Sequence, residues 1–156
     1  MRGERGESAW EMRGVTLSLA SVWCQAPLPL TTDWGMLPPH RLKVYSQALE
    51  LARVCARECG RIPDVDLRRQ LLRAVRSVPA NLAEGAVSES QAVFARHIAI
   101  AVGSLHEAHC HLTMATDAAL LPQGGRAAVE EHIDNLRPRL IRLLAAVRHQ
   151  AKRRAG

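Results

Sequence analysis

Apolar residues between positions 94 and 119 recur at spacings that alternate between four and three. The positions are Phe94, Ile98, Ala101, Leu105, Ala108, Leu112, Ala115 and Ala119. This alternation places them on one stripe of an α-helix, in the pattern of helices that pack nearly parallel to one another. It predicts a helix over residues 90–120 that is about 45 Å long.

Three more helices are predicted, over residues 39–59, 64–84 and 126–150. The last has the same alternation, with Pro138 as a bend, and its stripe is Val129, Ile133, Leu136, Leu140, Leu143 and Val147. The stripe of the second is Leu67, Leu71, Ala74 and Val78. Pro79 is expected to kink that helix and Gly85 to end it. For the first helix we expect a stripe of Leu42, Tyr45, Leu49, Ala52, Ala56 and Cys59.

Short turn signals separate these segments. Gly60 and the sequence Ile62-Pro63-Asp64 lead into the second helix, and Gly124-Gly125 precedes the fourth. Ser88 and Ser90 are alternative caps for the third helix, and Ser88 with Gln91 has the spacing of a capping box. Four helices with short connections predict an all-α protein, an antiparallel up-and-down four-helix bundle over residues 38–152. Aromatic residues are only 3% of the chain, which disfavours a sheet.

Residues 1–37 differ from the rest of the sequence. They contain all three tryptophans and follow no helical period. We expect a disordered or loosely structured extension, and one hypothesis is that residues 1–35 result from an upstream translation start, with Met36 as the alternative start. No apolar run approaches the roughly 18 residues of a membrane span, and no secretion signal is recognisable. A cytoplasmic protein without membrane contact is expected.

Positive charge is concentrated in the predicted bundle. Residues 36–156 hold 18 Lys and Arg against 11 Asp and Glu, whereas residues 1–35 hold 3 against 4. Arg69, Arg73 and Arg76 lie on one face of the second helix with Arg68 adjacent, a stripe that suits phosphate binding. The alternatives are a solvated face, ion pairs with neighbouring subunits, or arginine enrichment by a GC-rich genome. With few aromatic residues, base stacking is not expected.

The sequence His106-Glu107-Ala108-His109-Cys110-His111 is a near miss for H-E-x-x-H. A zinc site there needs a further ligand such as His132, and polar surface is the preferred interpretation. No histidine has a glutamate three residues before it, which excludes the di-iron pattern of helical bundles. No nucleotide-binding or nucleophile motif is present. We therefore predict no catalytic residue, no metal and no cofactor.

The stretch QLLRAVRSVPANLAEG at 70–85, followed by GSLHE at 103–107, resembles the four-helix-bundle family of 23S rRNA-intervening-sequence proteins. That family's relatives include accessory proteins of diversity-generating retroelements. The matching signature positions are Pro79, Asn81, Glu84, Gly85, Gly103, Ser104 and Glu107. Asn81 is expected to bond to Glu84, Glu107 or backbone freed by Pro79, and Gly103 with Ser104 to permit a close helix contact. Ser88 and Glu89 depart from the consecutive arginines of many members.

The resemblance implies self-association into pentamers, nucleic acid as a ligand and a reverse transcriptase as a partner. Apolar positions outside the stripes are the expected interface, namely Val44, Leu51, Val54, Leu72, Val75, Ile100 and Val102. The first hypothesis is a non-catalytic oligomeric scaffold that binds RNA or DNA backbone. The alternative is a structural oligomer whose partner is another protein and that has no nucleic-acid role.

Overall fold

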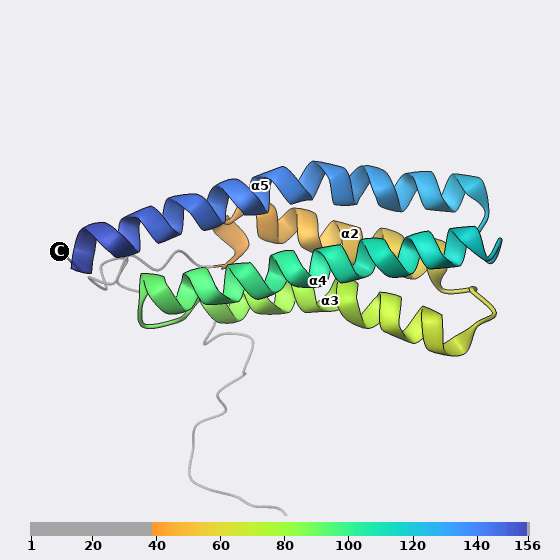
Figure 1. Ribbon diagram of the computed structural model, residues 1–156, viewed down its shortest axis with the longest axis horizontal. Coiled ribbons are helices and arrows are strands. Elements are labelled where there is room, and N and C mark those ends of the chain that lie inside the picture. Colours follow the sequence, from red (N-terminus) through yellow and green to blue (C-terminus); the bar gives the residue numbers. More distant parts are fainter. Residues whose placement is uncertain (1–38, 156) are drawn as a thin grey trace, which may run out of the picture. The chain divides into compact units, whose positions relative to one another are not determined.

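The computed structural model describes residues 39–155, and the predicted extension at 1–37 lies outside that range. A 3-10 turn, η1 (Pro39–Arg41), precedes four helices. These are α2 (Lys43–Cys59), α3 (Val65–Ala86), α4 (Gln91–Asp117) and α5 (Gln123–Ala155). Figure 1 shows them side by side and joined by short turns. The predicted all-α four-helix bundle is confirmed.

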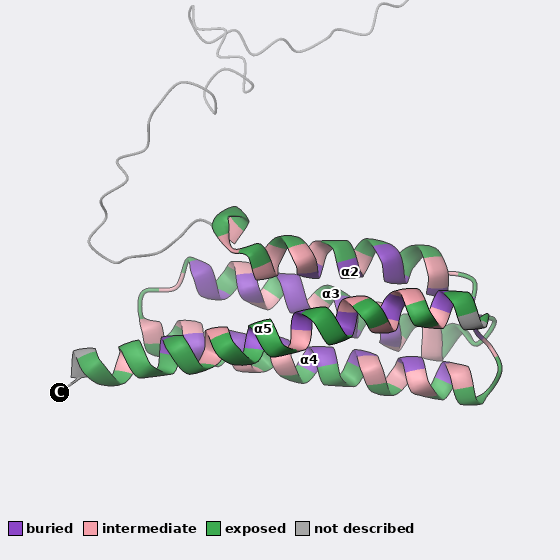
Figure 2. Ribbon diagram, turned by 90° about the horizontal axis from the view of Figure 1, so that it is seen from above, coloured by how far each residue is buried: buried purple, intermediate pink, exposed green. Residues whose placement is uncertain are grey.

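Each helix packs against two others. Contacts join α2 to α3, α3 to α4, α4 to α5 and α5 back to α2, and none joins α2 to α4 or α3 to α5 among the described residues. This ring of neighbours is the arrangement of an up-and-down bundle. Purple buried positions in Figure 2 run along the sides that the helices turn toward each other. No described helix carries an apolar, weakly charged stretch long enough to cross a bilayer.

The predicted stripes of α4 and α5 are largely the buried ones. Ile98, Leu105 and Leu112 are almost fully buried on α4, as are Ile133 and Leu140 on α5. The prediction for α2 is wrong: Ala56 is exposed, and Leu49 and Ala52 are only partly buried. The buried residues of α2 are Ala48, Leu51, Val54, Cys55 and Cys59. The apolar residues of α2 cover one broad side of the helix, and the predicted stripe followed the edge of that side that its neighbours leave partly exposed.

Gly85 does not end α3. The helix continues to Ala86, and a Cβ on Gly85 would lie 2.7 Å from Cβ of His97 and 2.8 Å from Cδ2 of Phe94. Gly85 therefore permits close approach of α4 to α3. Pro79 is buried within α3, and the helix continues on both sides of it.

Ser88 and Ser90 have different roles in the turn between α3 and α4: Ser88 bonds to the end of α3 and Ser90 caps α4. The Ser90 side chain caps α4 by accepting a hydrogen bond from the Val93 amide at 3.2 Å. The Ser88 hydroxyl donates to the Gly85 carbonyl at 2.7 Å, at the end of α3. The predicted capping box of Ser88 with Gln91 is therefore absent from this turn, because Ser88 serves the preceding helix.

Helix α4 ends earlier than the predicted residue 120. Ala119 has φ of 54°, in the left-handed region, and is exposed. Its amide donates to the Thr116 carbonyl at 2.8 Å, and the Leu120 amide donates to the Ala115 carbonyl at 2.9 Å. This pair of bonds is a Schellman motif with alanine at the position that glycine usually occupies. The absence of glycine there is why the sequence carries no stop signal.

Helix α5 is longer than predicted at both ends. It includes Gly124 and Gly125, which the sequence predicts to lie in the turn, and it continues to Ala155. Gly125 is buried, and a Cβ there would lie 3.5 Å from Cβ of Glu58 on α2. The C-terminal end of α5 projects past the beginning of α4 in both ribbon views (Figures 1 and 2).

Candidate nucleic-acid interface and the seam between α3 and α4

The four arginines predicted on α3 have different environments. Arg68 is partly buried, and its Nη1 donates to the Ile62 carbonyl at 2.8 Å, so it supports the turn before α3. Arg69 pairs with Asp66 at 2.7 Å (Nη2 to Oδ1) on the exposed surface. Arg73 and Arg76 are exposed and form no ion pair within residues 39–155. Of the four, these two are the ones that are both exposed and without an ion pair among the described residues.

A second basic surface lies on α5, and the sequence prediction missed it. After Asp134 the chain contains no Asp or Glu. Over the same stretch Arg137 is partly buried and pairs with Asp134 at 3.3 Å. The exposed cations of this surface, called the α5 basic surface below, are Arg139, Arg142, Arg148, Lys152 and Arg153. The signal was readable in the sequence as a helix whose acidic residues stop before its midpoint.

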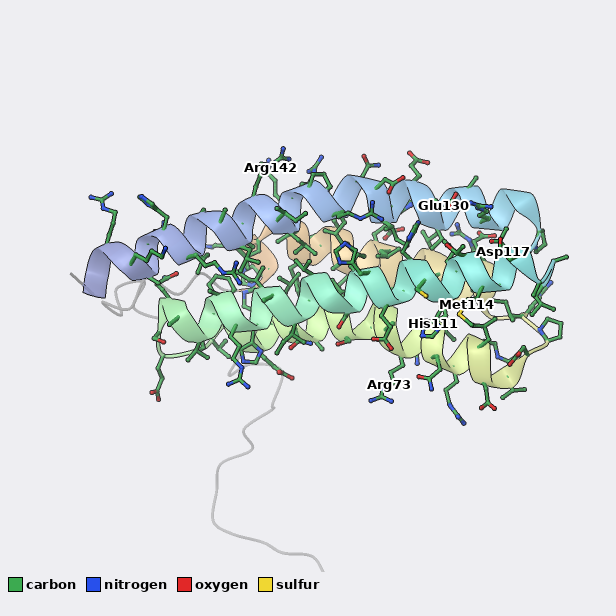
Figure 3. All side chains as sticks on the ribbon, viewed as in Figure 1. Arg73, His111, Met114, Asp117, Glu130 and Arg142 are labelled. Atoms are coloured by element: carbon green, nitrogen blue, oxygen red, sulfur yellow. The ribbon has the colours of Figure 1, made fainter. Side chains whose placement is uncertain are left out.

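The two basic regions do not meet within the chain. Helices α3 and α5 make no direct contact across the bundle. Arg73 and Arg142 point outward from opposite sides of it in Figure 3. A single molecule therefore presents two separate groups of exposed cations.

A chain of polar side chains crosses the interface between α3 and α4, called the polar seam below. The hydroxyls of Ser77 and Ser104 share a hydrogen bond of 2.8 Å. The Asn81 amide nitrogen donates to the Ser77 carbonyl at 2.9 Å and to its hydroxyl at 3.0 Å. Nδ1 of His97 lies 3.4 Å from Oδ1 of Asn81 and 3.6 Å from Oε2 of Glu84. These contacts specify which turn of α4 faces which turn of α3.

The structure gives Asn81 different partners from those that the sequence suggested. Neither Glu84 nor Glu107 bonds to it, and the carbonyl it contacts belongs to Ser77. Glu107 instead lies 3.6 Å from Nε2 of His111 on its own helix. Asn81 reaches Ser77 because the two residues are one helical turn apart. Glu107 is exposed on α4, on a side that the polar seam does not occupy.

Gly103 is not at a close helix contact within the chain. It is exposed, and a Cβ added to it would meet nothing within 4 Å. Its neighbour Ser104 is the residue that faces α3, since only 8% of it is exposed. The predicted close contact at Gly103 is therefore wrong for the isolated bundle.

The histidine and cysteine residues of the described helices do not gather into a site. His106 and Cys110 are exposed, whereas His111 is partly buried. No three His, Cys, Asp or Glu side chains converge to hold a metal in the part of the chain that the structure describes. Cys55 and Cys59 are buried free thiols one turn apart on α2. A hydrogen bond with Cys59, together with burial, raises the pKa of Cys55, so this thiol remains neutral.

The comparisons with known proteins agree with this fold. Residues 40–142 match the family model described as 23S rRNA-intervening sequence protein. The chain is also similar to the crystal structure of a protein with unknown function from the S23 ribosomal protein family of Bacteroides thetaiotaomicron. The TM-score is 0.60 and the identity is 19%, over 65% of this chain and 97% of that chain. That likeness shows the fold alone, and no curated protein matches the chain. Because the family model spans about two thirds of the sequence, from η1 into α5, the chain belongs to the 23S rRNA-intervening sequence protein family.

Proposed function

We propose that this protein is a non-catalytic oligomeric scaffold of the cytoplasm that binds the phosphate backbone of RNA or DNA. The observation that carries the proposal is the α5 basic surface, where five exposed cations follow the last acidic residue of the chain. None of these five cations forms an ion pair within residues 39–155, so their charge remains available to attract phosphate. Arg73 and Arg76 on α3 supply a second, smaller region of the same kind.

The chemistry of these residues favours backbone recognition. Guanidinium groups bind phosphate oxygens through charge-assisted, often bidentate hydrogen bonds. Tyr45 and Phe94 are the aromatic residues of the described bundle, and both are partly buried against its core. Extended stacking of bases on aromatic rings is therefore not part of the proposal. Each phosphate contact releases counterions, so affinity should fall steeply with salt.

Self-association is proposed through the outer side of α4. Val93, Ile100 and Met114 are 42%, 45% and 52% exposed, and they share a stripe with Gly103 and Cys110, on which the exposed Arg96 and Glu107 also lie. Gly103 leaves open space on this stripe, which allows a helix of a second copy to approach closely. The interface predicted from sequence is wrong at Leu51, Val54 and Val75, because these residues are in the core of the bundle. Val44, Leu72 and Val102 are partly buried against that core.

The resemblance to retroelement accessory proteins supports a pentameric assembly and a reverse transcriptase as partner. The exposed α4 stripe also favours the second candidate function, a structural oligomer that binds protein only. A ring of copies would repeat both basic regions around the assembly and add their contributions through multivalency. Nucleic-acid binding and assembly can therefore be separated by variants on different helices.

The proposal is tested by titrating labelled RNA and DNA with the purified chain between roughly 50 and 200 mM salt. The variant Arg142→Gln, Arg148→Gln, Lys152→Gln removes three charges from α5. We expect weaker binding and a salt slope reduced by roughly 0.7–0.9 for each phosphate that the variant no longer neutralises.

Arg53→Gln is the matched control, because Arg53 already pairs with Glu50 at 2.9 Å. This variant should bind RNA and DNA like the parent. Absence of binding at the lowest salt concentration, or an α5 variant that binds like the parent, would contradict the proposal. Intact oligomers without nucleic-acid binding would favour the protein-only function.

A further inference from the structure

The excess of positive charge is not spread evenly around the bundle. Helix α5 holds 8 Lys and Arg against 3 Asp and Glu, and α3 holds 4 against 2. The two helices between them are nearly balanced, with 3 against 2 in α2 and 1 against 2 in α4. Because α3 and α5 make no contact among the described residues, the positive excess lies on opposite corners of the bundle.

The surfaces of α2 and α4 separate these two corners. On α2, both arginines pair with a glutamate of the same helix, at 2.9 Å and 2.7 Å. On α4, the exposed Glu107 and Asp117 outnumber the one arginine of that helix, Arg96. A polyanion that lies along α5 therefore meets largely compensated or negative surface before it reaches Arg73 and Arg76 on α3.

Arg73 and Arg76 lie in a part of α3 without free carboxylates. Both are exposed, and neither forms an ion pair within residues 39–155. Of the two acids of the helix, Asp66 pairs with Arg69 at 2.7 Å. The other, Glu84, is eight residues after Arg76, about 12 Å further along the helix. The two guanidinium groups are thus one turn apart and available to phosphate oxygens.

A duplex is too stiff to contact both corners at once. Packed helices lie about 8–10 Å apart and are about 10–12 Å wide, so the bundle measures roughly 20–25 Å from corner to corner. The persistence length of duplex DNA is about 50 nm, roughly twenty times that width. Arg73 and Arg142 point outward from opposite sides of the bundle (Figure 3). A duplex bound along α5 therefore leaves Arg73 and Arg76 free for a second one.

We propose that this protein bridges two nucleic-acid duplexes, one held on the α5 basic surface and a second held by Arg73 and Arg76. The bridge rests on the proposed function, because both contacts are made with phosphate backbone. The α5 contact is the stronger, since its cations extend over roughly 21 Å of helix from Arg139 to Arg153. The α3 contact of one chain is weak and gains from several copies on the same two duplexes.

Bridging is measured by immobilising a biotinylated duplex on beads and adding a fluorescent duplex of the same sequence with the full chain. At roughly 50 mM salt the protein should retain the fluorescent duplex on the beads. Fluorescence anisotropy measures the binding of a single duplex separately. RNA and DNA duplexes are tested in parallel, and both should be bridged because both present a phosphate backbone.

Arg73→Gln combined with Arg76→Gln should lower the amount of retained fluorescent duplex about tenfold, while the Kd for a single duplex changes less than about twofold. Both side chains are exposed, so the bundle should stay folded. Arg53→Gln combined with Arg57→Gln is the matched control. It also removes two arginines, but these already form ion pairs on α2, so the control should bridge like the parent.

The outcomes separate the bridge from the proposed function. Binding of a single duplex without retention of a second overturns the bridge and leaves the proposed function intact. Full retention by the Arg73→Gln, Arg76→Gln variant also overturns it, because the second duplex is then held by the α5 basic surface of another copy. Equal loss in both double variants contradicts the assignment to Arg73 and Arg76. Absence of any duplex binding refutes the proposed function and the bridge together.

Discussion

Ser77 on α3 and Ser104 on α4 share a hydrogen bond of 2.8 Å across the interface of the two helices. The same Ser77 hydroxyl accepts from the Asn81 amide at 3.0 Å, so three side chains form one connected group. Because a change at one member alters the partners of the others, their contributions to stability should not be additive. The polar seam therefore has a measurable signature in the free energy of unfolding.

Ser77→Ala and Ser104→Ala should each lower the free energy of unfolding by about 1 kcal/mol. The double variant should be less destabilised than the sum of the two, because the bond between the hydroxyls is removed in both single variants. Urea denaturation of the four proteins in the double-mutant cycle measures the coupling. Strict additivity would show that the two hydroxyls do not interact in solution.

Gly85→Ala should lower the free energy of unfolding by about 1–3 kcal/mol. The added Cβ would lie 2.7 Å from Cβ of His97, and neither helix can shift without loosening the seam. Gly124→Ala is the matched control, since a Cβ there meets nothing within 4 Å and the position lies outside the proposed interface. Near the start of α5 it should raise helix stability by less than roughly 1 kcal/mol. Thermal or urea denaturation distinguishes the two, and equal effects would contradict the observed α3–α4 packing.

Ala119→Gly should stabilise the protein by about 0.5–1 kcal/mol. Ala119 has φ of 54°, a conformation that costs an L side chain free energy and glycine very little. Ala118→Gly is the comparison, because Ala118 has φ of −79° and gains nothing from glycine. Its stability should fall slightly. A decrease for Ala119→Gly in differential scanning calorimetry would show that α4 does not end in a Schellman motif.

Ile100→Glu should dissociate the proposed assembly and leave the bundle folded. Ile100 is 45% exposed within one chain, so a charge there is tolerated by the monomer but is costly when the proposed interface buries it. Leu105→Ala is the contrasting variant, since Leu105 is in the core and its truncation should cost about 2–5 kcal/mol of folding free energy. Sedimentation velocity and circular dichroism report mass and helicity. An unchanged mass for Ile100→Glu would exclude the α4 stripe as the interface.

The fold itself was predictable from local pattern. On α4 and α5 the predicted stripes are apolar at every position, and the bundle buries most of those residues. The helix caps followed local chemistry in part: Asp64 caps α3 by accepting from the Leu67 amide at 2.9 Å. The basic half of α5 was also readable from the sequence, because no Asp or Glu follows Asp134.

The failures concern residues whose role depends on another helix. Gly85 resembles a helix stop, but its role is in packing: because it has no side chain, His97 and Phe94 of α4 can pack against α3 at this position. Arg68 resembles its neighbours Arg69 and Arg73, but the turn at Ile62 engages it. The α2 stripe was predicted wrongly because the apolar side of that helix is broad, and the predicted stripe followed one edge of it. His97 and Phe94, which contact Gly85, belong to the next helix. Ile62, which bonds to Arg68, belongs to the turn that precedes α3.

By itself, the sequence determined that four amphipathic helices form and that their charge is mainly positive, because periodicity and charge are properties of each segment alone. Only the tertiary structure decided which part of the apolar side of α2 is buried, which arginines form ion pairs and which polar groups meet at the polar seam. Those outcomes depend on how each helix is rotated about its own axis and how far it is shifted along that axis relative to its neighbours. Side-chain packing and interhelical hydrogen bonds set that relation, and both act between residues far apart in the chain.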